Sequence, residues 1–223
     1  MTESSFDSEG LFNEDYLYFY AERTASARSV AEGELVWRLL ELEPDMEVLD
    51  LACGHGRLAN YLAERGCRVT GLDATPLFLE RAREDAHARA VTVDYVLGDM
   101  RRLPWGRRFD RIINWFTSFG YFTDADNRLV LAECVRVLRP GGRLALDMMH
   151  YLWLLRHYQP VTMIERDGNL LIDQNQLEPL TGRNMVERVV IRGGQVRRIP
   201  FFVRLFTFTE LRGTGCWRQA LPR

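Results

Sequence analysis

Two glycines and an aspartate, close together in the first half of the chain, form the strongest candidate for a ligand-binding site. Residues 48–59 read VLDLACGHGRLA, in which a short apolar run precedes Gly54 and Gly56 and a helical apolar period follows them. A glycine turn between a strand and a helix lets a ligand approach the backbone, and the helix N-terminus offers unpaired N–H groups. Asp50, at the end of the strand, could bind a cationic amino group held in this turn.

A second and a third motif follow the glycine turn. The distance from the turn to Asp73 also fits the dinucleotide-binding fingerprint, but Asp50 would repel a pyrophosphate held there. A Gly-Asp-Met sequence at 98–100 follows another apolar strand, and LRPGGRL at 138–144 leads into a further one. Three motifs in this order resemble those of class I S-adenosylmethionine-dependent methyltransferases. The resemblance covers residues 48–149, which is close to half of the chain.

The resemblance implies that S-adenosylmethionine is the methyl donor and that S-adenosylhomocysteine is the product. It places the methionine part of the cofactor at the glycine turn, the ribose at Asp73, and the adenine at Asp99 and Met100. A carboxylate suits two vicinal ribose hydroxyls because both of its oxygens accept hydrogen bonds. The alternatives are that Asp73 caps the next helix together with Thr75 and that Asp99 is a turn residue. The predicted cofactor-binding residues are Asp50, Ala52, Cys53, Gly54, Gly56, Asp73, Ala74, Asp99, Met100, Asn114, Tyr20 and Arg23.

The N-terminal segment, residues 12–43, reads as a cap on the rest of the chain. Its tyrosines precede an amphipathic helix that ends before Pro44. In the resembling family, residues just before this helix often close over the cofactor, which would bring Tyr20 and Arg23 to its carboxylate. Aromatic packing of the cap against the body is the alternative for these residues.

An aromatic stretch at the end of the fourth strand indicates the acceptor site. Asn114 would pass under the cofactor, whereas Ser118, Phe119 and Tyr121 would face the acceptor molecule. The stretch lacks the (Asn/Asp)-Pro-Pro-(Tyr/Phe) pattern and the Pro-Cys nucleophile of the best-known DNA-modifying classes. It instead resembles small-molecule O- and N-methyltransferases, such as those that act on antibiotic precursors and amino sugars. An aromatic lining suits a hydrophobic or ring-bearing acceptor.

Methyl transfer needs little from the protein beyond positioning, because the sulfonium of the cofactor already activates the methyl group. A general base is required only when the acceptor is a hydroxyl or a protonated amine. His150, just after the fifth strand, is the candidate because an imidazole titrates near neutral pH. The alternative is a loop histidine that binds water or caps Asp147.

The composition gives no support for a nucleic-acid or membrane partner. With 29 Lys and Arg against 31 Asp and Glu, the chain has no excess of positive charge that would attract a nucleic acid. No apolar run reaches the ~20 residues that span a bilayer, and no signal-peptide pattern opens the chain, so we expect a cytoplasmic protein without membrane contact. The four cysteines lack metal-ligand spacing, so we expect reduced thiols and no metal site.

The order of the elements predicts an α/β fold. Strands at 48–52, 68–73, 91–97, 109–116 and 144–149 alternate with helical segments, which predicts a doubly wound, mostly parallel Rossmann-like sheet with helices on both faces. Ligands of such sheets bind beyond the C-terminal strand ends, where all the motifs lie. The predicted domains are an N-terminal helical cap (1–43), a SAM-binding Rossmann-like core (44–150), a small antiparallel β lid or substrate region (151–208) and a truncated C-terminal segment (209–223).

The last third of the chain changes to a β pattern. Segments 183–192 and 195–207, joined by a Gly-Gly pair, predict a hairpin, and 170–177 predicts a third strand. In the resembling families this region is a lid over the acceptor site. Thr209 is the expected cap of a final helix, after which the family's last two strands are missing. The fifth strand would then be a sheet edge, which predicts a homodimer, aggregation, or cover by 195–207.

Two other classes of function stay open. A catalytically degenerate, SAM-binding regulatory protein would keep Asp50, Gly54 and Asp73 yet lose the acceptor pocket, and the intact stretch 118–121 argues against it. A nucleotide-dependent oxidoreductase would leave the motif at 138–142 unexplained. The preferred prediction is a methyltransferase that acts on an O or N nucleophile of a small molecule.

Overall fold

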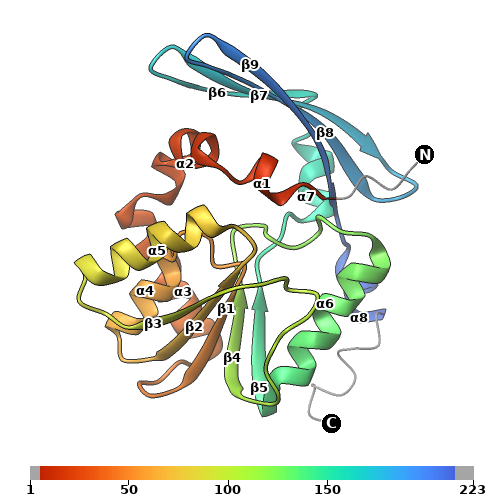
Figure 1. Ribbon diagram of the computed structural model, residues 1–223. Coiled ribbons are helices and arrows are strands. Elements are labelled where there is room, and N and C mark those ends of the chain that lie inside the picture. The colour runs from red at the N-terminus through yellow and green to blue at the C-terminus, as the bar shows by residue number, and fades with distance from the viewer. Residues whose placement is uncertain (1–5, 214–223) are drawn as a thin grey trace.

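The structure, a computed structural model that describes residues 6–213, has a five-stranded parallel sheet at its centre (Figure 1). The strand order β3-β2-β1-β4-β5 confirms the predicted doubly wound α/β fold. The chain winds outward in one direction and then returns, so the topological switch point lies between β1 and β4, where ligands of such sheets bind. The strands are β1 (Glu47–Leu51), β2 (Arg68–Asp73), β3 (Val93–Leu97), β4 (Phe109–Asn114) and β5 (Leu138–Leu146).

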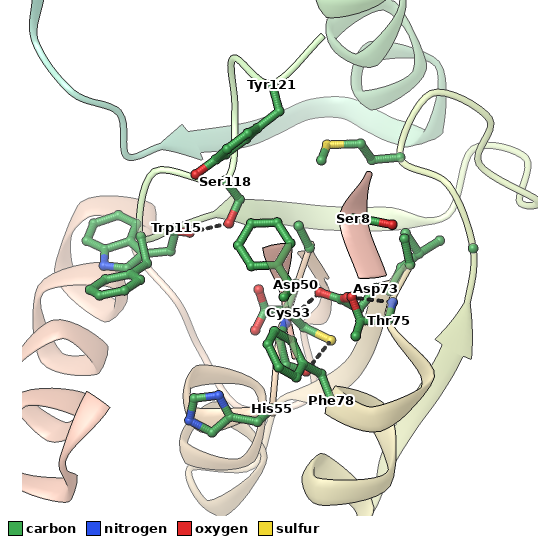
Figure 2. A pocket seen from close by; sticks show the side chains of 18 of the residues that line it. Ser8, Asp50, Cys53, His55, Asp73, Thr75, Phe78, Trp115, Ser118 and Tyr121 are labelled. Atoms are coloured by element: carbon green, nitrogen blue, oxygen red, sulfur yellow. Dashed lines mark hydrogen bonds between the residues drawn. The ribbon is translucent and has the colours of Figure 1, made fainter. Parts of the chain in front are cut away.

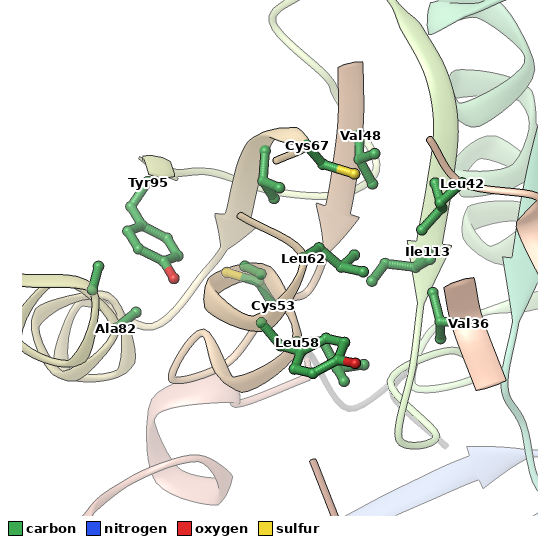
Figure 3. Close-up of a cluster of buried hydrophobic side chains, with 14 of the residues drawn as sticks. Val36, Leu42, Val48, Cys53, Leu58, Leu62, Cys67, Ala82, Tyr95 and Ile113 are labelled. Atoms are coloured by element: carbon green, nitrogen blue, oxygen red, sulfur yellow. The ribbon is translucent and has the colours of Figure 1, made fainter. Parts of the chain in front are cut away.

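Alternation along the central strands divides the core into two layers. Val48 of β1 and Ile113 of β4 pack with helices α3, α4 and α5 in one layer (Figure 3), whereas Leu49 and Ile112 pack with α6 in the other. Successive side chains of a strand point to opposite faces, and both faces of this sheet are covered, so the strands are mostly buried. The helices are α3 (Ser26–Leu40), α4 (Arg57–Glu64), α5 (Pro76–Ala88) and α6 (Asp124–Val137).

Three short helices lie between the parallel sheet and the second sheet (Figure 1): α1 (Ser8–Leu11), α2 (Glu14–Tyr20) and the 3-10 helix η1 (Glu22–Thr24). Asn13 caps α2, because its side-chain oxygen accepts from the backbone N–H of Asp15 at 2.9 Å. On α2, Phe19 is buried against Leu171 and Val190 of the second sheet. The N-terminal helices therefore connect the core to that sheet.

The second sheet is antiparallel and has the order β6-β7-β8-β9. The predicted hairpin is confirmed, with the Gly-Gly turn in the left-handed region (φ 57° and 76°), and so is the strand before it. Strand β6 was not predicted, although the Asp-Gly pair at 167–168 after it is a typical hairpin turn. The elements are α7 (Tyr151–Arg156), β6 (Val161–Arg166), β7 (Asn169–Glu178), β8 (Arg183–Arg192) and β9 (Gln195–Arg204).

Two strand boundaries differ from the prediction. β4 ends at Asn114 rather than at Phe116, because Phe116 and Thr117 have positive φ angles of 59° and 57° that no extended strand allows. β5 starts and ends earlier than the predicted range 144–149, since the Pro-Gly-Gly sequence continues the chain directly from α6 into the strand. His150 therefore lies four residues beyond the end of β5.

The C-terminal predictions are partly corrected. β9 pairs with β8 along its whole length, so the prediction that residues 195–207 cover the edge of β5 is wrong. The last described helix, α8 (Phe208–Gly213), is capped by Thr207 rather than by Thr209. Thr207 Oγ1 accepts from the N–H of Glu210 at 3.2 Å, and the Glu210 carboxylate accepts from the N–H of Thr207 at 2.8 Å, which is a capping box. Residues 214–223 lie outside the described part, and homodimer formation through β5 stays a prediction.

Within residues 6–213, no helix is long and apolar enough to cross a membrane, and no group of three or more His, Cys, Asp or Glu side chains could hold a metal ion. Cys53, Cys67 and Cys134 are buried free thiols, as the expectation of reduced cysteines requires. Cys216 lies outside this range.

Candidate active site

A cavity of about 190 Å³ lies at the C-terminal ends of β1, β2 and β4, against α1 and α2 (Figure 2). It brings together ten of the predicted site residues, which lie far apart in the sequence: Asp50, Ala52, Cys53, Gly54, Asp73, Ala74, Asp99, Met100, Ser118 and Tyr121. Six others do not line it: Gly56, Asn114, Tyr20, Arg23, Phe119 and His150.

The two glycines of the turn serve different purposes. Gly54 has a φ of 56° and only one neighbouring atom, 3.9 Å from where a Cβ would lie, so the backbone is open to the cavity. Gly56 has a φ of 78° and precedes α4. A methyl group on Gly56 would lie 2.2 Å from Tyr95 Oη and 2.8 Å from Ala82 Cβ. Gly56 is therefore required by packing beneath the turn rather than by contact with a ligand.

Replacement of Gly56 by Ala should destabilise the fold by roughly 2–5 kcal/mol, since it adds overpacking to the cost of a positive φ. Gly141→Ala is the matched control, because Gly141 has the same φ of 78° but nothing within 4 Å of its added methyl. We expect only the smaller conformational cost, about 1 kcal/mol, at that position. Denaturant unfolding of both variants checks this, and equal losses would contradict the packing role.

Asp73, at the end of β2, holds the glycine turn in place. Its Oδ2 accepts from the N–H of Gly54 at 2.8 Å, and its Oδ1 accepts from the N–H of Thr75 at 2.9 Å. Burial raises the pKa of this carboxyl, although the backbone hydrogen bonds oppose the change. The carboxylate has more acceptor sites than these two hydrogen bonds use, and Asp73 lines the cavity. Both the helix-start role with Thr75 and a role in ligand binding are compatible with this geometry.

Asp50 is the second buried carboxyl of the cavity, with only 3% of its surface exposed. Burial and the neighbouring charge of Asp73 raise the pKa of Asp50 to about 7, although the positive charge of Arg57 lowers it. A cationic group bound beside Asp50 would favour the ionised carboxylate and lower this pKa again.

Asp99 has a partner that the sequence did not indicate. Arg101 binds the Asp99 carboxylate through Nε at 2.9 Å and Nη2 at 2.6 Å, and its guanidinium lies 4.6 Å from the centre of the Phe122 ring. Burial alone would raise the pKa of Asp99, but the hydrogen bonds from Arg101 outweigh it and lower the pKa. An adenine amino group at Asp99 would share the carboxylate with Arg101.

The N-terminal cap contributes Tyr16 to the cavity instead of Tyr20. Tyr20 is stacked behind Tyr16, with the ring centres 4.5 Å apart, and its hydroxyl accepts from Arg188 Nη2 of β8 at 3.0 Å. Arg23 is exposed and lies 5.3 Å from the centre of the Tyr20 ring. Neither of the two side chains predicted to reach the cofactor carboxylate therefore lines the cavity: Tyr20 lies one helical turn after Tyr16, and Arg23 lies in η1.

The loop after β4 divides between cavity and core. Asn114 is buried, and its Nδ2 donates to the carbonyl of Leu51 at 2.8 Å, which joins β4 to β1 across the switch point. Ser118 lines the cavity and donates to the carbonyl of Trp115 at 2.8 Å. Phe119 is 2% exposed and packs against Phe206 in the core. Tyr121 lines the cavity (Figure 2).

The imidazole that lines the cavity is His55, not His150. His150 is exposed and caps α7, where its Nδ1 accepts from the N–H of Trp153 at 3.3 Å. His55 lies in the glycine turn and packs edge-on against Phe78. Burial and the nearby Arg57 lower the pKa of His55, so its ring is neutral at neutral pH. The predicted role of His150 has no support from the shape of the cavity.

Four of the cavity residues that the sequence did not single out come from four elements, α1 with its C-cap, α2, α4 and α5: Phe12, Tyr16, Arg57 and Phe78. The rings of Phe12, Tyr16 and Phe78 form a triangle, with centres 5.2, 5.6 and 6.2 Å apart. Their spacing in the sequence carries no signal, because the contact joins α1, α2 and α5. Arg57 carried a local signal, since it directly follows the glycine turn.

Comparison with known proteins agrees with this geometry. Residues 48–142 match a family described as a methyltransferase domain. The chain is 38% identical over 122 residues to a demethylmenaquinone methyltransferase of Thermus thermophilus, which covers 51% of this chain and 54% of that protein. It thus spans about half the length of that curated relative.

Two solved structures have the same fold. The CcbJ methyltransferase of Streptomyces caelestis matches with a TM-score of 0.76 and 22% identity, over 94% of this chain and 86% of that one. SAM-bound CalS10 of Micromonospora echinaspora, an amino pentose methyltransferase in calicheamicin biosynthesis, matches with a TM-score of 0.67 and 22% identity, over 95% and 90%.

Proposed function

We propose that this chain, whose residues 48–142 match a methyltransferase domain family, transfers a methyl group from S-adenosylmethionine to an oxygen or nitrogen nucleophile of a small molecule. The observation that carries the proposal is the cavity in which Asp50, Gly54, Asp73 and Asp99 come together at the strand ends. CalS10 supports it through the shared fold and a bound SAM.

The cavity has a suitable group for each part of the cofactor. Asp73 would accept from the ribose hydroxyls, and Asp50 would bind the ammonium group. The open backbone at Gly54 lets the methionine part lie against the turn. The triangle of Phe12, Tyr16 and Phe78 offers ring faces to a cation, and such contacts are favourable within about 6 Å of a ring centre.

Tyr16 and Tyr121 would position the acceptor. Burial raises the pKa of both hydroxyls, so both are neutral donors at physiological pH. Among residues 6–213 neither hydroxyl has a hydrogen-bond partner, although both residues line the cavity. The centre of the Phe201 ring, from β9, lies 6.1 Å from the centre of the Tyr121 ring, so the second sheet contacts the cavity wall at Tyr121. Two neutral donors among aromatic rings suit a hydroxylated ring such as an amino sugar.

The protein's contribution to the chemistry is positioning and exclusion of water. S-adenosylmethionine supplies, when bound, a methyl group activated by its sulfonium for in-line displacement. Tyr16, Tyr121 and Ser118 would hold the nucleophile in the aromatic cavity. His55 lines the cavity as a neutral ring that can accept a hydrogen bond from a hydroxyl acceptor, although the burial that lowers its pKa makes it a weaker base than an exposed imidazole.

Calorimetry with S-adenosylhomocysteine and NAD, followed by a methyl-transfer screen with labelled donor, tests the proposal. The screen would contain amino sugars, phenols and a demethylmenaquinone analogue. We expect binding of S-adenosylhomocysteine, no binding of NAD, and label on a ring-bearing acceptor. Binding of NAD alone would favour an oxidoreductase, and cofactor binding with no transfer would favour a regulatory protein.

A further inference from the structure

Arg57 is a buried cation in the cavity wall with an unused donor. It is the first residue of α4, has 9% of its surface exposed and lines the same cavity as Asp50. Its Nη2 donates to Glu32 Oε2 at 2.6 Å, and its guanidinium lies 5.0 Å from the centre of the Phe116 ring. Its Nη1 is buried and has no partner among residues 6–213. Buried donors without a partner are rare, so this one indicates a ligand group.

We propose that Arg57 binds the carboxylate of the methionine part of the cofactor while Asp50 binds its ammonium group, an assignment that rests on the proposed function. The two side chains line the same cavity, carry opposite charges and lie close enough to interact electrostatically, which matches an amino-acid zwitterion. The N-terminus of α4, where Arg57 lies, adds favourable backbone dipoles for an anion. Arg57 thus takes the role predicted for Tyr20 and Arg23.

The other arginines near the site are less suitable. Arg101 lines the cavity, but Asp99 and Asp126 bind its guanidinium. Arg23 is exposed, and neither Arg23 nor Arg28 lines the cavity. Arg57 alone among the described arginines combines a cavity position with a free donor.

Glu32 fixes the orientation of Arg57. Its carboxylate accepts from Arg57 Nη2, from Arg28 Nε at 2.7 Å and from Trp115 Nε1 at 3.1 Å. Burial alone would raise the pKa of Glu32, but hydrogen bonds from Arg28 and Arg57 outweigh it and lower the pKa. An ionised Glu32 therefore holds one edge of the guanidinium and leaves Nη1 for the ligand.

The test compares two ligands that differ in the amino-acid part. Calorimetry would measure the affinity of S-adenosylhomocysteine and of 5′-methylthioadenosine, which has the nucleoside and sulfur but no amino-acid group. We expect Arg57→Gln to weaken S-adenosylhomocysteine binding by roughly 10- to 100-fold and to change methylthioadenosine binding by less than about threefold, since a charge-assisted hydrogen bond is lost only with the first ligand. Arg57→Lys, which keeps the positive charge beside Glu32, should weaken S-adenosylhomocysteine binding less than Arg57→Gln does.

Arg23→Gln is the control, because Arg23 is an exposed arginine that does not line the cavity. It should leave both affinities unchanged. Equal losses for both ligands in Arg57→Gln, or an unchanged affinity for S-adenosylhomocysteine, would overturn the proposal. Wild-type protein should also bind decarboxylated S-adenosylhomocysteine at least ~10-fold more weakly than the parent, a comparison that needs no variant. A wild-type protein that binds neither S-adenosylhomocysteine nor 5′-methylthioadenosine would instead overturn the proposed function itself.

Discussion

Asp73→Ala is expected to weaken S-adenosylhomocysteine binding by roughly ten- to several-hundred-fold. The loss has two sources. Two charge-assisted hydrogen bonds to ribose, at ~1.5–3 kcal/mol each and incompletely additive, disappear with the carboxylate. The N–H groups of Gly54 and Thr75 also lose their acceptors, so the turn that carries the open backbone is no longer fixed to β2.

The 2′-deoxy analogue of S-adenosylhomocysteine separates these two sources. A direct contact predicts that Asp73→Ala reduces binding of the parent ligand more than binding of the analogue, whereas a loosened turn predicts equal losses. Unfolding measurements on the same variant report the cost of the two unpaired N–H groups, about 1–3 kcal/mol each. An unchanged affinity in a folded variant would remove Asp73 from the binding site.

The order of the motifs along the chain predicted the parallel sheet well, because each motif follows a buried strand and parallel strands present their C-terminal ends at one edge. This strand order alone was enough to predict that four residues would lie in one cavity: Asp50, Gly54, Asp73 and Asp99. The same reasoning could not find the triangle of aromatic rings, since its members come from segments whose packing is decided by tertiary structure.

His150 was wrongly placed at the catalytic edge of the sheet because the end of the fifth strand was predicted too late in the sequence. The apolar run 144–149 suggested a strand that ends directly before His150, but β5 starts at Leu138 and is complete at Leu146. The four residues after it lead away to α7, and His150 becomes its cap. The prediction for Tyr20 failed for another reason. Tyr16 and Tyr20 lie on the same face of α2, and packing of Tyr20 against β8 decides which of them lines the cavity.

Asp50→Asn is expected to change ligand binding and stability in opposite directions. Because burial raises the pKa of Asp50 to about 7, the free protein near pH 6 is mostly protonated at this position. A cationic ligand requires the ionised form. Wild-type affinity for S-adenosylhomocysteine should therefore fall as the pH drops below 7, approaching tenfold per pH unit, and level off above 7. The Asn variant should bind weakly and without this pH dependence.

The stability of the ligand-free protein follows the opposite trend. A folded-state pKa above the unfolded value means that the folded protein binds the proton more tightly, so stability falls as the pH rises from about 4 to 7. Asn carries no charge at any pH and removes this loss. Unfolding at pH 7.5 should show Asp50→Asn to be more stable than the wild type by about 1–3 kcal/mol, with the gain shrinking toward pH 4.5. His55 and Asp73 are titratable groups in the same cavity whose pKa values are also shifted. A comparison of the variant with the wild type is therefore needed to assign the pH dependence to Asp50. A stability difference that does not depend on pH would show that the Asp50 carboxyl is not held in its protonated form by the fold.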